Sequence, residues 1–365
     1  VYINMNILFF LTPKSEVAYI TEDFTIRQTL DKMKEHKYSS IPILTKDGKY
    51  VGTITEGDLL WTLEDLAEKN EISLKDIDFM PVIDVPRRKN NTPVSISANM
   101  ELLVSKAISQ NFVPVIDDSE TFIGKISVEE LIEWSDTIIF MLTTSEVIES
   151  LLIKKINNPT IYEGKTIINM GTISPSFSTK LNREFNKYNA FYVDAPVSGS
   201  KIPAEEGKLI ILTSGNHSII DTLNPLFKTM GTTIVYCGEI PKASMIKLSI
   251  NLLILHMMEG FSEMINFASK GGIDLNFLFE IVLSSQISNS LYRMKYKNYL
   301  HDKFPVQGSV ENGYKDLVLI TETAKEIGAY LPLTNINLQV YLKAKELGYA
   351  EEDFSAIIKV LEKYY

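Results

Sequence analysis

The pattern of apolar and polar positions predicts one long helix from Pro241 to Gly272. Proline is favoured in the first turn of a helix and glycine at its end, and the stretch begins and ends with these residues. Within residues 245–258 apolar side chains occur on every face of this helix, so we expect it to be buried. Lys247 and Asn251 lie one turn apart on one face of it, with Ser244 a turn earlier. Lys247 either extends its ammonium to the surface along an apolar stem or serves a buried polar site.

Upstream of this helix, predicted strands alternate with predicted helices. This alternation is typical of the second half of a dinucleotide-binding fold. The first half of this fold, which carries the phosphate-binding turn, is absent from the pattern. That turn needs two glycines separated by one residue, and the chain has no such pair. We therefore expect the first of these strands to be a sheet edge. The expected strands are 137–142, 166–171, 190–196, 209–214 and 233–237, and the expected helices lie near 145–153, 176–187 and 217–228.

The part of the chain before residue 134 contains an internal repeat. Residues 22–60 and 96–133 each read as a helix, a strand, a turn, a second strand and a helix start. The first turn is Asp47-Gly48, a strong hairpin signal. The apolar run 1–11 is too short to span a membrane and lacks the basic flank of a signal peptide, so we expect a strand or edge segment of the first domain.

Composition narrows the class of protein. The 36 basic and 46 acidic residues give a net charge of −10, which argues against nucleic acid as the main partner. The single cysteine, Cys237, excludes disulfides within the chain and fits a reducing compartment, so we expect a cytoplasmic protein without a membrane partner. The four histidines show no metal-ligand spacing, and we expect no metal site.

Four motifs occur in order in the second part of the chain: INMGTISP at 168–175, VDAPVSGS at 193–200, the pair Lys247 and Asn251, and KDL at 315–317. Together they resemble the β-hydroxyacid dehydrogenase family, which includes 3-hydroxyisobutyrate dehydrogenases and glyoxylate/succinic semialdehyde reductases. The resemblance covers residues 129–365. Gly171 and Gly308 depart from it, since the family often has a serine at the first position and an aromatic residue at the second.

This resemblance implies a site for a hydroxyacid or semialdehyde substrate and for NAD or NADP. Lys247 would exchange a proton with the substrate oxygen, because burial keeps the charge of a lysine tunable. Asn251 would orient the same oxygen, and Asp316 would support the site from the helical domain. The turn Ser198, Gly199 and Ser200 would hold the substrate carboxylate, and the cofactor-side residues would be Thr172, Lys315 and Asp316.

The repeat resembles a tandem cystathionine-β-synthase (CBS) module. In that family a Gly-x-x-Thr-x-x-Asp run contacts a bound adenine nucleotide, and the first copy matches it with Gly52, Thr55 and Asp58. This implies AMP, ATP or a cyclic dinucleotide as a ligand in the cleft served by the first copy. The alternative is that Thr55 only caps a helix. The second copy has Gly124, Ser127 and Glu130 at these positions, and the basic residues Arg87, Arg88 and Lys89 are either a solvated linker or a phosphate contact.

These patterns predict an α/β and α architecture. A CBS pair occupies residues 1–134, the C-terminal half of a Rossmann sheet occupies 135–240, and an all-helical dehydrogenase domain occupies 241–365. We expect a homo-oligomer, because the strand edge has to be covered. Three functions stay open: an NAD(P)-dependent oxidoreductase that completes its cofactor site elsewhere, a nucleotide-binding regulatory protein, or a recombined gene without an NAD(P) site.

Overall fold

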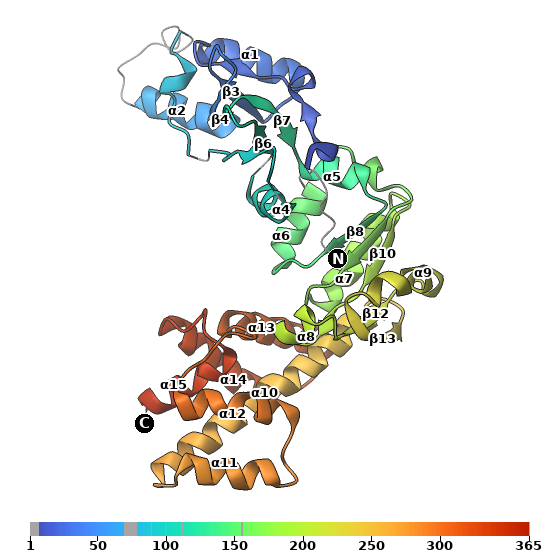
Figure 1. The fold of residues 1–365 in the computed structure, drawn as a ribbon, viewed down its shortest axis with the longest axis vertical. Coiled ribbons are helices and arrows are strands. Elements are labelled where there is room, and N and C mark those ends of the chain that lie inside the picture. Colours follow the sequence, from blue (N-terminus) through green and yellow to red (C-terminus); the bar gives the residue numbers. More distant parts are fainter. Residues whose placement is uncertain are drawn as a thin grey trace. The chain divides into compact units, whose positions relative to one another are not determined.

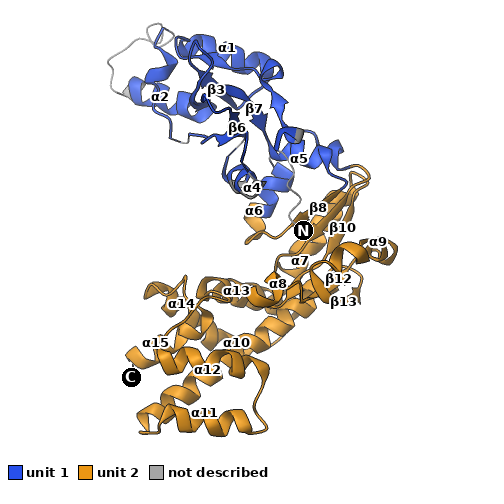
Figure 2. Ribbon diagram, in the orientation of Figure 1, with its two compact units in different colours: residues 1–136, 148–162 blue, residues 137–147, 163–365 orange. Residues whose placement is uncertain are grey.

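A computed structural model describes residues 7–68, 79–88, 90–98, 100–110, 112–154 and 156–364. The chain divides into two units, which Figure 2 shows in different colours. Unit 1 comprises Val1–Asp136 and Ile148–Tyr162, and unit 2 comprises Thr137–Val147 and Glu163–Tyr365.

Unit 1 contains the predicted repeat, and the two copies have the same order of elements (Figure 1). In each copy a parallel strand pair is followed by an antiparallel hairpin. The strand order is β2-β3-β4 in one sheet and β1-β7-β6-β5 in the other. The first copy consists of β2 (Ile20–Thr21), α1 (Ile26–His36), β3 (Ser40–Leu44), β4 (Tyr50–Thr55) and α2 (Glu56–Glu68), and the second of β5 (Val94–Ser95), α4 (Met100–Ser109), β6 (Val113–Ile116), β7 (Phe122–Ile126) and α5 (Val128–Trp134).

The two hairpins of unit 1 meet at their turns. Gly48 has φ +84°, which suits glycine, and its carbonyl accepts a hydrogen bond of 3.0 Å from the backbone N–H of Phe122. The rings of Tyr50 and Phe122 stack with centroids 6.1 Å apart. The predicted turn at Asp47-Gly48 is therefore confirmed, and it also joins the two copies.

The N-terminal apolar run is not one strand. Ile7–Phe10 form a 3₁₀ helix, and only Thr12–Pro13 pair as the edge strand β1, antiparallel to β7. Ile7 and Phe10 are buried in the core of the second copy, which explains the compact turn in place of an extended strand. Residues 1–6 of the predicted segment lie outside the described residues.

Unit 2 begins with a sheet in the order β11-β12-β10-β9-β8, and β13 pairs in parallel with β12. Among the described residues β8 pairs only with β9, so it is the predicted sheet edge, and its Ile139 is 40% exposed. Helix α7 (Pro175–Asn186) packs on β10, and α9 (His217–Phe227) packs on β12 and β13. The strands are β8 (Thr137–Phe140), β9 (Thr166–Asn169), β10 (Phe191–Asp194), β11 (Val197–Ser198), β12 (Leu209–Ser214) and β13 (Gly231–Gly238).

The connection from β8 to β9 leaves the sheet's unit. It runs through α6 (Ser145–Glu149), a π-helical turn (Ser150–Lys154) and the 3₁₀ helix η5 (Pro159–Tyr162), and residues 148–162 belong to unit 1. Buried apolar side chains and the contact of η5 with α5 hold it there. The sequence predicted an ordinary helix at 145–153; the structure instead has one short α-helix and a π-turn.

The remainder of unit 2 is helical, as predicted, and packs around α10 (Lys242–Lys270) (Figure 1). Pro241 and Gly271 stand at its ends. The helix is not buried all round, because its neighbours cover one side: Leu253 is 61% and Phe267 83% exposed. No helix among the described residues combines the length and apolarity that a membrane crossing requires. The other helices are α11 (Leu275–Ser284), α12 (Ser290–His301), α13 (Val310–Ile327), α14 (Pro332–Glu346) and α15 (Ile358–Tyr364).

Candidate functional site

Lys247 is the central residue of the predicted catalytic site. It lies on α10, is partly buried, and its Nζ makes no hydrogen bond with any residue the structure describes. Desolvation lowers the pKa of Lys247, the negative charge of Asp316 opposes this effect, and the positive charge of Lys315 adds to it. A lysine in such surroundings can lose and regain its proton more readily than one at the surface.

The structure brings four further predicted residues together. Asn251 Nδ2 donates a hydrogen bond of 2.7 Å to Asp316 Oδ2. Lys315 Nζ donates one of 3.1 Å to the backbone carbonyl of Thr172, in the loop after β9. Lys315 Nζ also lies 3.0 Å from Asp316 Oδ1, as an ion pair outside hydrogen-bonding geometry. These contacts connect α10, α13 and the end of β9.

A buried polar network that the sequence analysis missed holds the start of α10. Asp194, at the end of β10, accepts hydrogen bonds from the Ser244 backbone N–H (3.0 Å), the Ser244 hydroxyl (2.6 Å) and Asn169 Nδ2 (3.2 Å). Burial raises the pKa of Asp194 to about 6 against the opposing effect of these hydrogen bonds. Ser244 precedes Lys247 by one helical turn, so the network positions the lysine. A signal was present, since Asp194 ends an otherwise apolar strand.

The turn Ser198, Gly199 and Ser200 lies between β11 and α8 (Lys201–Glu205). Gly199 has φ +142°, and a Cβ there would meet the side chain of Leu209 at 2.7 Å, so the turn requires glycine. Ser200 Oγ is buried without a hydrogen-bond partner among the described residues. No hydrogen bond in the described parts of the chain joins this turn to Lys247 or Asn251. The unpaired hydroxyl of Ser200 can donate a hydrogen bond to a carboxylate.

The residues present do not fit the pyrophosphate of a dinucleotide. Strand β8 is the sheet edge, and the chain has no Gly-x-Gly turn. A Cβ at Gly171 would meet the Leu142 carbonyl at 2.8 Å, so the loops after β8 and β9 approach each other closely. Among the described residues no group of His, Cys, Asp and Glu side chains could hold a metal ion.

In the first copy of the repeat, the predicted nucleotide-binding residues bond to one another. Asp58 Oδ2 accepts hydrogen bonds from the Thr55 hydroxyl (2.7 Å) and backbone N–H (3.0 Å), and Thr55 Oγ1 accepts one from the Asp58 N–H (3.1 Å). This is a capping box at the start of α2. Asp58 Oδ1 accepts from the Arg88 N–H at 3.0 Å, so the carboxylate, 4% exposed, is fully engaged.

The connection between the two copies covers this motif. Arg87 Nη1 donates to the Val51 carbonyl at 3.1 Å, and a Cβ at Gly52 would meet the same nitrogen at 2.0 Å. The Arg88 guanidinium lies 5.3 Å from the Trp61 ring. Lys89, the third member of the basic cluster, lies outside the described residues.

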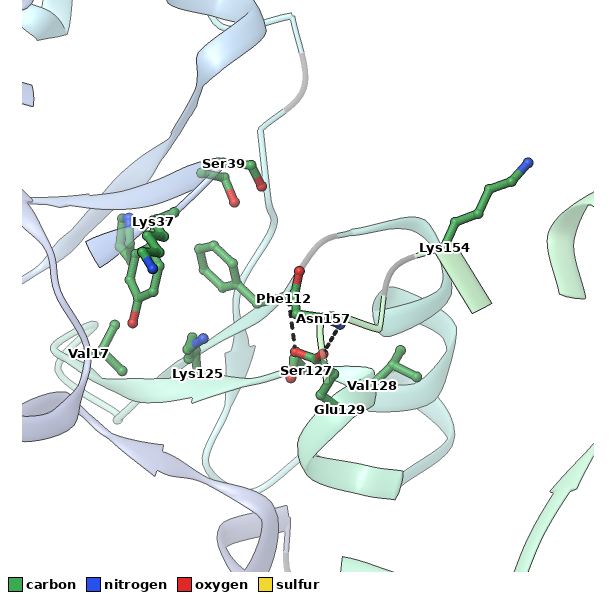
Figure 3. Close-up of a pocket in the computed structure, with 13 residues that line it drawn as sticks. Val17, Lys37, Ser39, Phe112, Lys125, Ser127, Val128, Glu129, Lys154 and Asn157 are labelled. Atoms are coloured by element: carbon green, nitrogen blue, oxygen red, sulfur yellow. Dashed lines mark hydrogen bonds between the residues drawn. The ribbon is translucent and has the colours of Figure 1, made fainter. Parts of the chain in front are cut away.

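A pocket of 420 Å³ is lined instead by residues of both copies (Figure 3). Three lysines, Lys37, Lys125 and Lys154, and one acidic residue, Glu129, are among its lining residues, and the Lys154 ammonium lies 3.3 Å from Glu149. Neither Thr55 nor Asp58 lines it. The remaining lining comes from Val17, Tyr38, Ser39, Ser40, Pro42, Phe112, Ser127, Val128 and Asn157.

Three family models match the chain. Residues 10–65 match the CBS domain, residues 93–238 match the NAD binding domain of 6-phosphogluconate dehydrogenase, and residues 242–361 match the NAD-binding domain of NADP-dependent 3-hydroxyisobutyrate dehydrogenase. NAD(P)-binding-type domains are therefore present beside a CBS domain. The second match starts within the second copy of the repeat, so residues that align with a dinucleotide-binding domain fold here as part of unit 1.

Curated relatives point to the same family. Glyoxylate/succinic semialdehyde reductase 1 of Arabidopsis thaliana is 30% identical over 55% of this chain and 70% of its own length. Reductase 2 of the same plant is 31% identical over 55% of this chain, which spans only 56% of that relative. The 2-hydroxy-3-oxopropionate reductase of Escherichia coli is 29% identical over 68% of this chain and 86% of its own length.

Solved structures show the same fold. A 3-hydroxyisobutyrate dehydrogenase from Salmonella typhimurium superposes with a TM-score of 0.59 at 21% identity, over 72% of this chain and 88% of that one. The enzyme from Mycobacterium tuberculosis has the same score at 22% identity, over 70% of this chain and 94% of its own. The chain belongs to the β-hydroxyacid dehydrogenase family, and it carries a CBS domain in addition.

Proposed function

We propose that unit 2 carries an oxidoreductase site for a β-hydroxyacid or semialdehyde. The proposal rests on the environment of Lys247. Its amine has no hydrogen-bond partner among the described residues, and burial lowers its pKa. In oxidation the neutral amine takes the proton of the substrate hydroxyl, and in reduction the ammonium returns a proton to the oxygen. Relatives named as glyoxylate and succinic semialdehyde reductases support these substrate classes.

The neighbouring residues have supporting roles in this proposal. Asn251, fixed by Asp316, orients the substrate oxygen, and the turn Ser198, Gly199 and Ser200 holds the carboxylate. Thr172 and Lys315 lie on the cofactor side. NAD or NADP supplies the hydride chemistry when bound. Its pyrophosphate has to be held by groups beyond these residues, in a second copy of the chain or elsewhere in it, and we expect a homo-oligomer for the same reason.

We divide the chain by function into a CBS pair at 1–134, a partial dinucleotide-binding domain at 135–240 and a helical domain at 241–365.

The experiment is an NADPH-dependent assay of the full chain with glyoxylate and succinic semialdehyde. Lys247→Ala should lower kcat/KM by about 10²- to 10⁴-fold, the usual contribution of a positioned proton-transfer group. Lys242→Ala is the matched control, because Lys242 is exposed on the same helix. Activity that survives Lys247→Ala would refute the role of Lys247.

A second candidate function is nucleotide binding by unit 1. The pocket with its lysines and aromatic rings supports a tandem CBS arrangement that takes AMP, ATP or a cyclic dinucleotide. The sequence motif predicts Gly52, Thr55 and Asp58 as ribose and phosphate contacts. The hydrogen bonds of Asp58 to Thr55 and Arg88 favour the alternative, a helix cap, so we do not place these residues in the proposed nucleotide site. A nucleotide that binds only the folded unit raises its melting temperature by mass action. Thermal shifts with AMP, ATP and cyclic di-AMP test this, and no shift with any of them would refute it.

A further inference from the structure

Helices α10, α13 and α14 of unit 2 pack against one another (Figure 1), and their interface contains polar atoms that the proposed site does not use. Glu259 Oε2 on α10 and the Tyr341 hydroxyl on α14 are buried without a hydrogen-bond partner among the described residues, and so are both amide atoms of Asn337. Asn337 is 1% exposed and Tyr341 is fully buried. Buried groups that lack a protein partner are normally satisfied by ordered water. We therefore expect water at this interface.

Tyr341 lies between Glu259 and the proposed catalytic site. A Cβ at Gly313 would collide with Tyr341 Cε1 and would meet Leu255 Cδ2 at 3.2 Å, so the Tyr341 ring lies beside Leu255. Leu255 follows Asn251 of the proposed site by four residues and precedes Glu259 by four. Because an α-helix rises about 1.5 Å per residue, Asn251 and Glu259 are about 12 Å apart along α10. The Tyr341 hydroxyl and a few water molecules span this distance.

Asn337 lies on the same face of α14 as two residues that reach α10. Thr334, three residues before it, shares a hydrogen bond of 3.1 Å with His256 Nε2, and Tyr341, four residues after it, lies beside Leu255. His256 and Leu255 are neighbours in one turn of α10, so Asn337 lies against that turn. Its amide offers two donors and an acceptor, which suits it to hold water.

Glu259 can exchange a proton near neutral pH. Burial raises its pKa to about 7, and the charge of Glu263 adds to this. Burial and, after it, the charge of Glu259 raise the pKa of Tyr341, so these two groups are close. Glu259 is partly exposed although its Oε2 is buried, so its carboxyl connects the interior with the solvent. The other titratable and charged groups around this interior are His256 and Glu263 on α10, Tyr292 and Tyr299 on α12, Asp316 on α13, and the ion pair of Lys295 with Asp353.

We propose that Glu259, Asn337 and Tyr341 hold a chain of ordered water that carries the catalytic proton between Lys247 and the solvent, with Glu259 at its outer end. This rests on the proposed oxidoreductase function of unit 2. In oxidation Lys247 takes the proton of the substrate hydroxyl, its ammonium releases that proton to the water chain, and the Glu259 carboxylate passes it to the solvent. In reduction one proton moves along the same groups in the opposite direction. A substrate bound at Lys247 blocks direct exit on its own side, so this route leads away from the substrate.

Chemical rescue tests the relay in the full chain, with the NADPH-dependent reduction of glyoxylate and succinic semialdehyde as the assay. Glu259→Gln keeps the size of the side chain but removes its proton exchange. At low buffer concentration its kcat should fall at least about tenfold at unchanged KM, less than the 10²- to 10⁴-fold of a group in contact with substrate. Added imidazole should restore kcat, because a small buffer molecule can deliver the proton in place of Glu259. The wild type should not depend on buffer concentration.

Two further variants separate a relay from a structural effect. Tyr341→Phe keeps the ring against Gly313 and removes only the hydroxyl, so it should show the same loss and the same rescue by imidazole. Glu263→Gln is the matched control, because Glu263 is an exposed carboxylate one turn further along α10, and it should behave as the wild type.

Infrared titration gives a readout that does not depend on activity. The difference between the spectra of the wild type and of Glu259→Gln isolates the carboxyl band of Glu259, since Asp194 contributes equally to both. This band should titrate near pH 7. Asn337→Leu should move the titration to higher pH, because water held by the amide stabilises the carboxylate.

Three results would overturn the relay: undiminished activity of Glu259→Gln at low buffer concentration, a loss of kcat that imidazole does not restore, or titration of Glu259 at its ordinary pKa of 4.5. The second result would show that Glu259 has only a structural role. In each case an active wild type would leave the proposed function of unit 2 intact. A wild type that reduces neither substrate would instead refute that function, and the relay with it.

Discussion

The hydroxyl of Ser244 donates a hydrogen bond of 2.6 Å to the carboxylate of Asp194, which is fully buried. Asp194 ends a strand of the sheet, and Ser244 lies in the first turn of α10. The backbone N–H of Ser244 donates to the same oxygen at 3.0 Å. The carboxylate thus satisfies a free donor of the helix start and fixes α10, with Lys247 one turn further on, to the sheet.

Asp194 should make the stability of unit 2 depend on pH. Its native pKa of about 6 lies above the ordinary value of 3.8, so the native state binds its proton more tightly than the unfolded state does. The stabilisation of the native state that follows from this raised pKa is present below pH 4 and is lost as the pH rises through 6. The free energy of unfolding of the wild type minus that of Asp194→Asn should fall by about 2 kcal/mol between pH 4 and pH 7. Urea unfolding over this range, with the exposed Glu280→Gln as control, measures it, and a constant difference would contradict the prediction.

Asp316→Asn should move the pH dependence of oxidation to lower pH. The charge of Asp316 raises the pKa of Lys247, so its removal lets desolvation lower that pKa further. In the proposed mechanism, oxidation requires the neutral amine of Lys247, so the rising limb of kcat/KM should appear at a lower pH than in the wild type. An asparagine at 316 can still accept the hydrogen bond from Asn251. Glu322→Gln, an exposed change on the same helix, should leave the profile in place.

The chain alone should bind NADPH weakly, with a dissociation constant above the micromolar range, which corresponds to less than about 8 kcal/mol of binding free energy. Strand β8 is an edge, and no glycine-rich turn is available for the pyrophosphate. Titration of the purified protein by NADPH fluorescence is the measurement. Lys315→Ala should weaken whatever binding remains. A micromolar constant would show that another part of the protein has replaced the missing turn.

Asp58→Ala should destabilise unit 1 by about 1 kcal/mol, within the 0.5–2 kcal/mol range for lost helix caps. The carboxylate accepts hydrogen bonds from Thr55 and Arg88, which keep it from a ribose. We therefore expect a lower melting temperature without nucleotide and an unchanged shift on adding AMP. Loss of the AMP shift would instead restore the ribose-binding role that the motif implies.

Several elements of the fold could be predicted from local signals in the sequence. The Pro241 and Gly272 signals placed α10 to within two residues at each end, because helix ends depend on neighbouring residues. The absence of a Gly-x-Gly turn predicted the edge at β8, and the four-residue spacing placed Lys247 and Asn251 on one face of α10. The repeat was also readable, since each copy carries its own strand, turn and strand pattern.

Only the tertiary structure decided which polar groups find partners. Whether Asp58 is free for a ligand depends on the N–H of Arg88, thirty residues away, and Asp194 meets Ser244 across fifty residues. The sequence predicted a helix of the dinucleotide-binding fold at 145–153, and nothing local to it indicates that the connection packs on α5. Burial and hydrogen bonding of a side chain are set by segments distant in the chain, which a pattern of neighbouring residues does not contain.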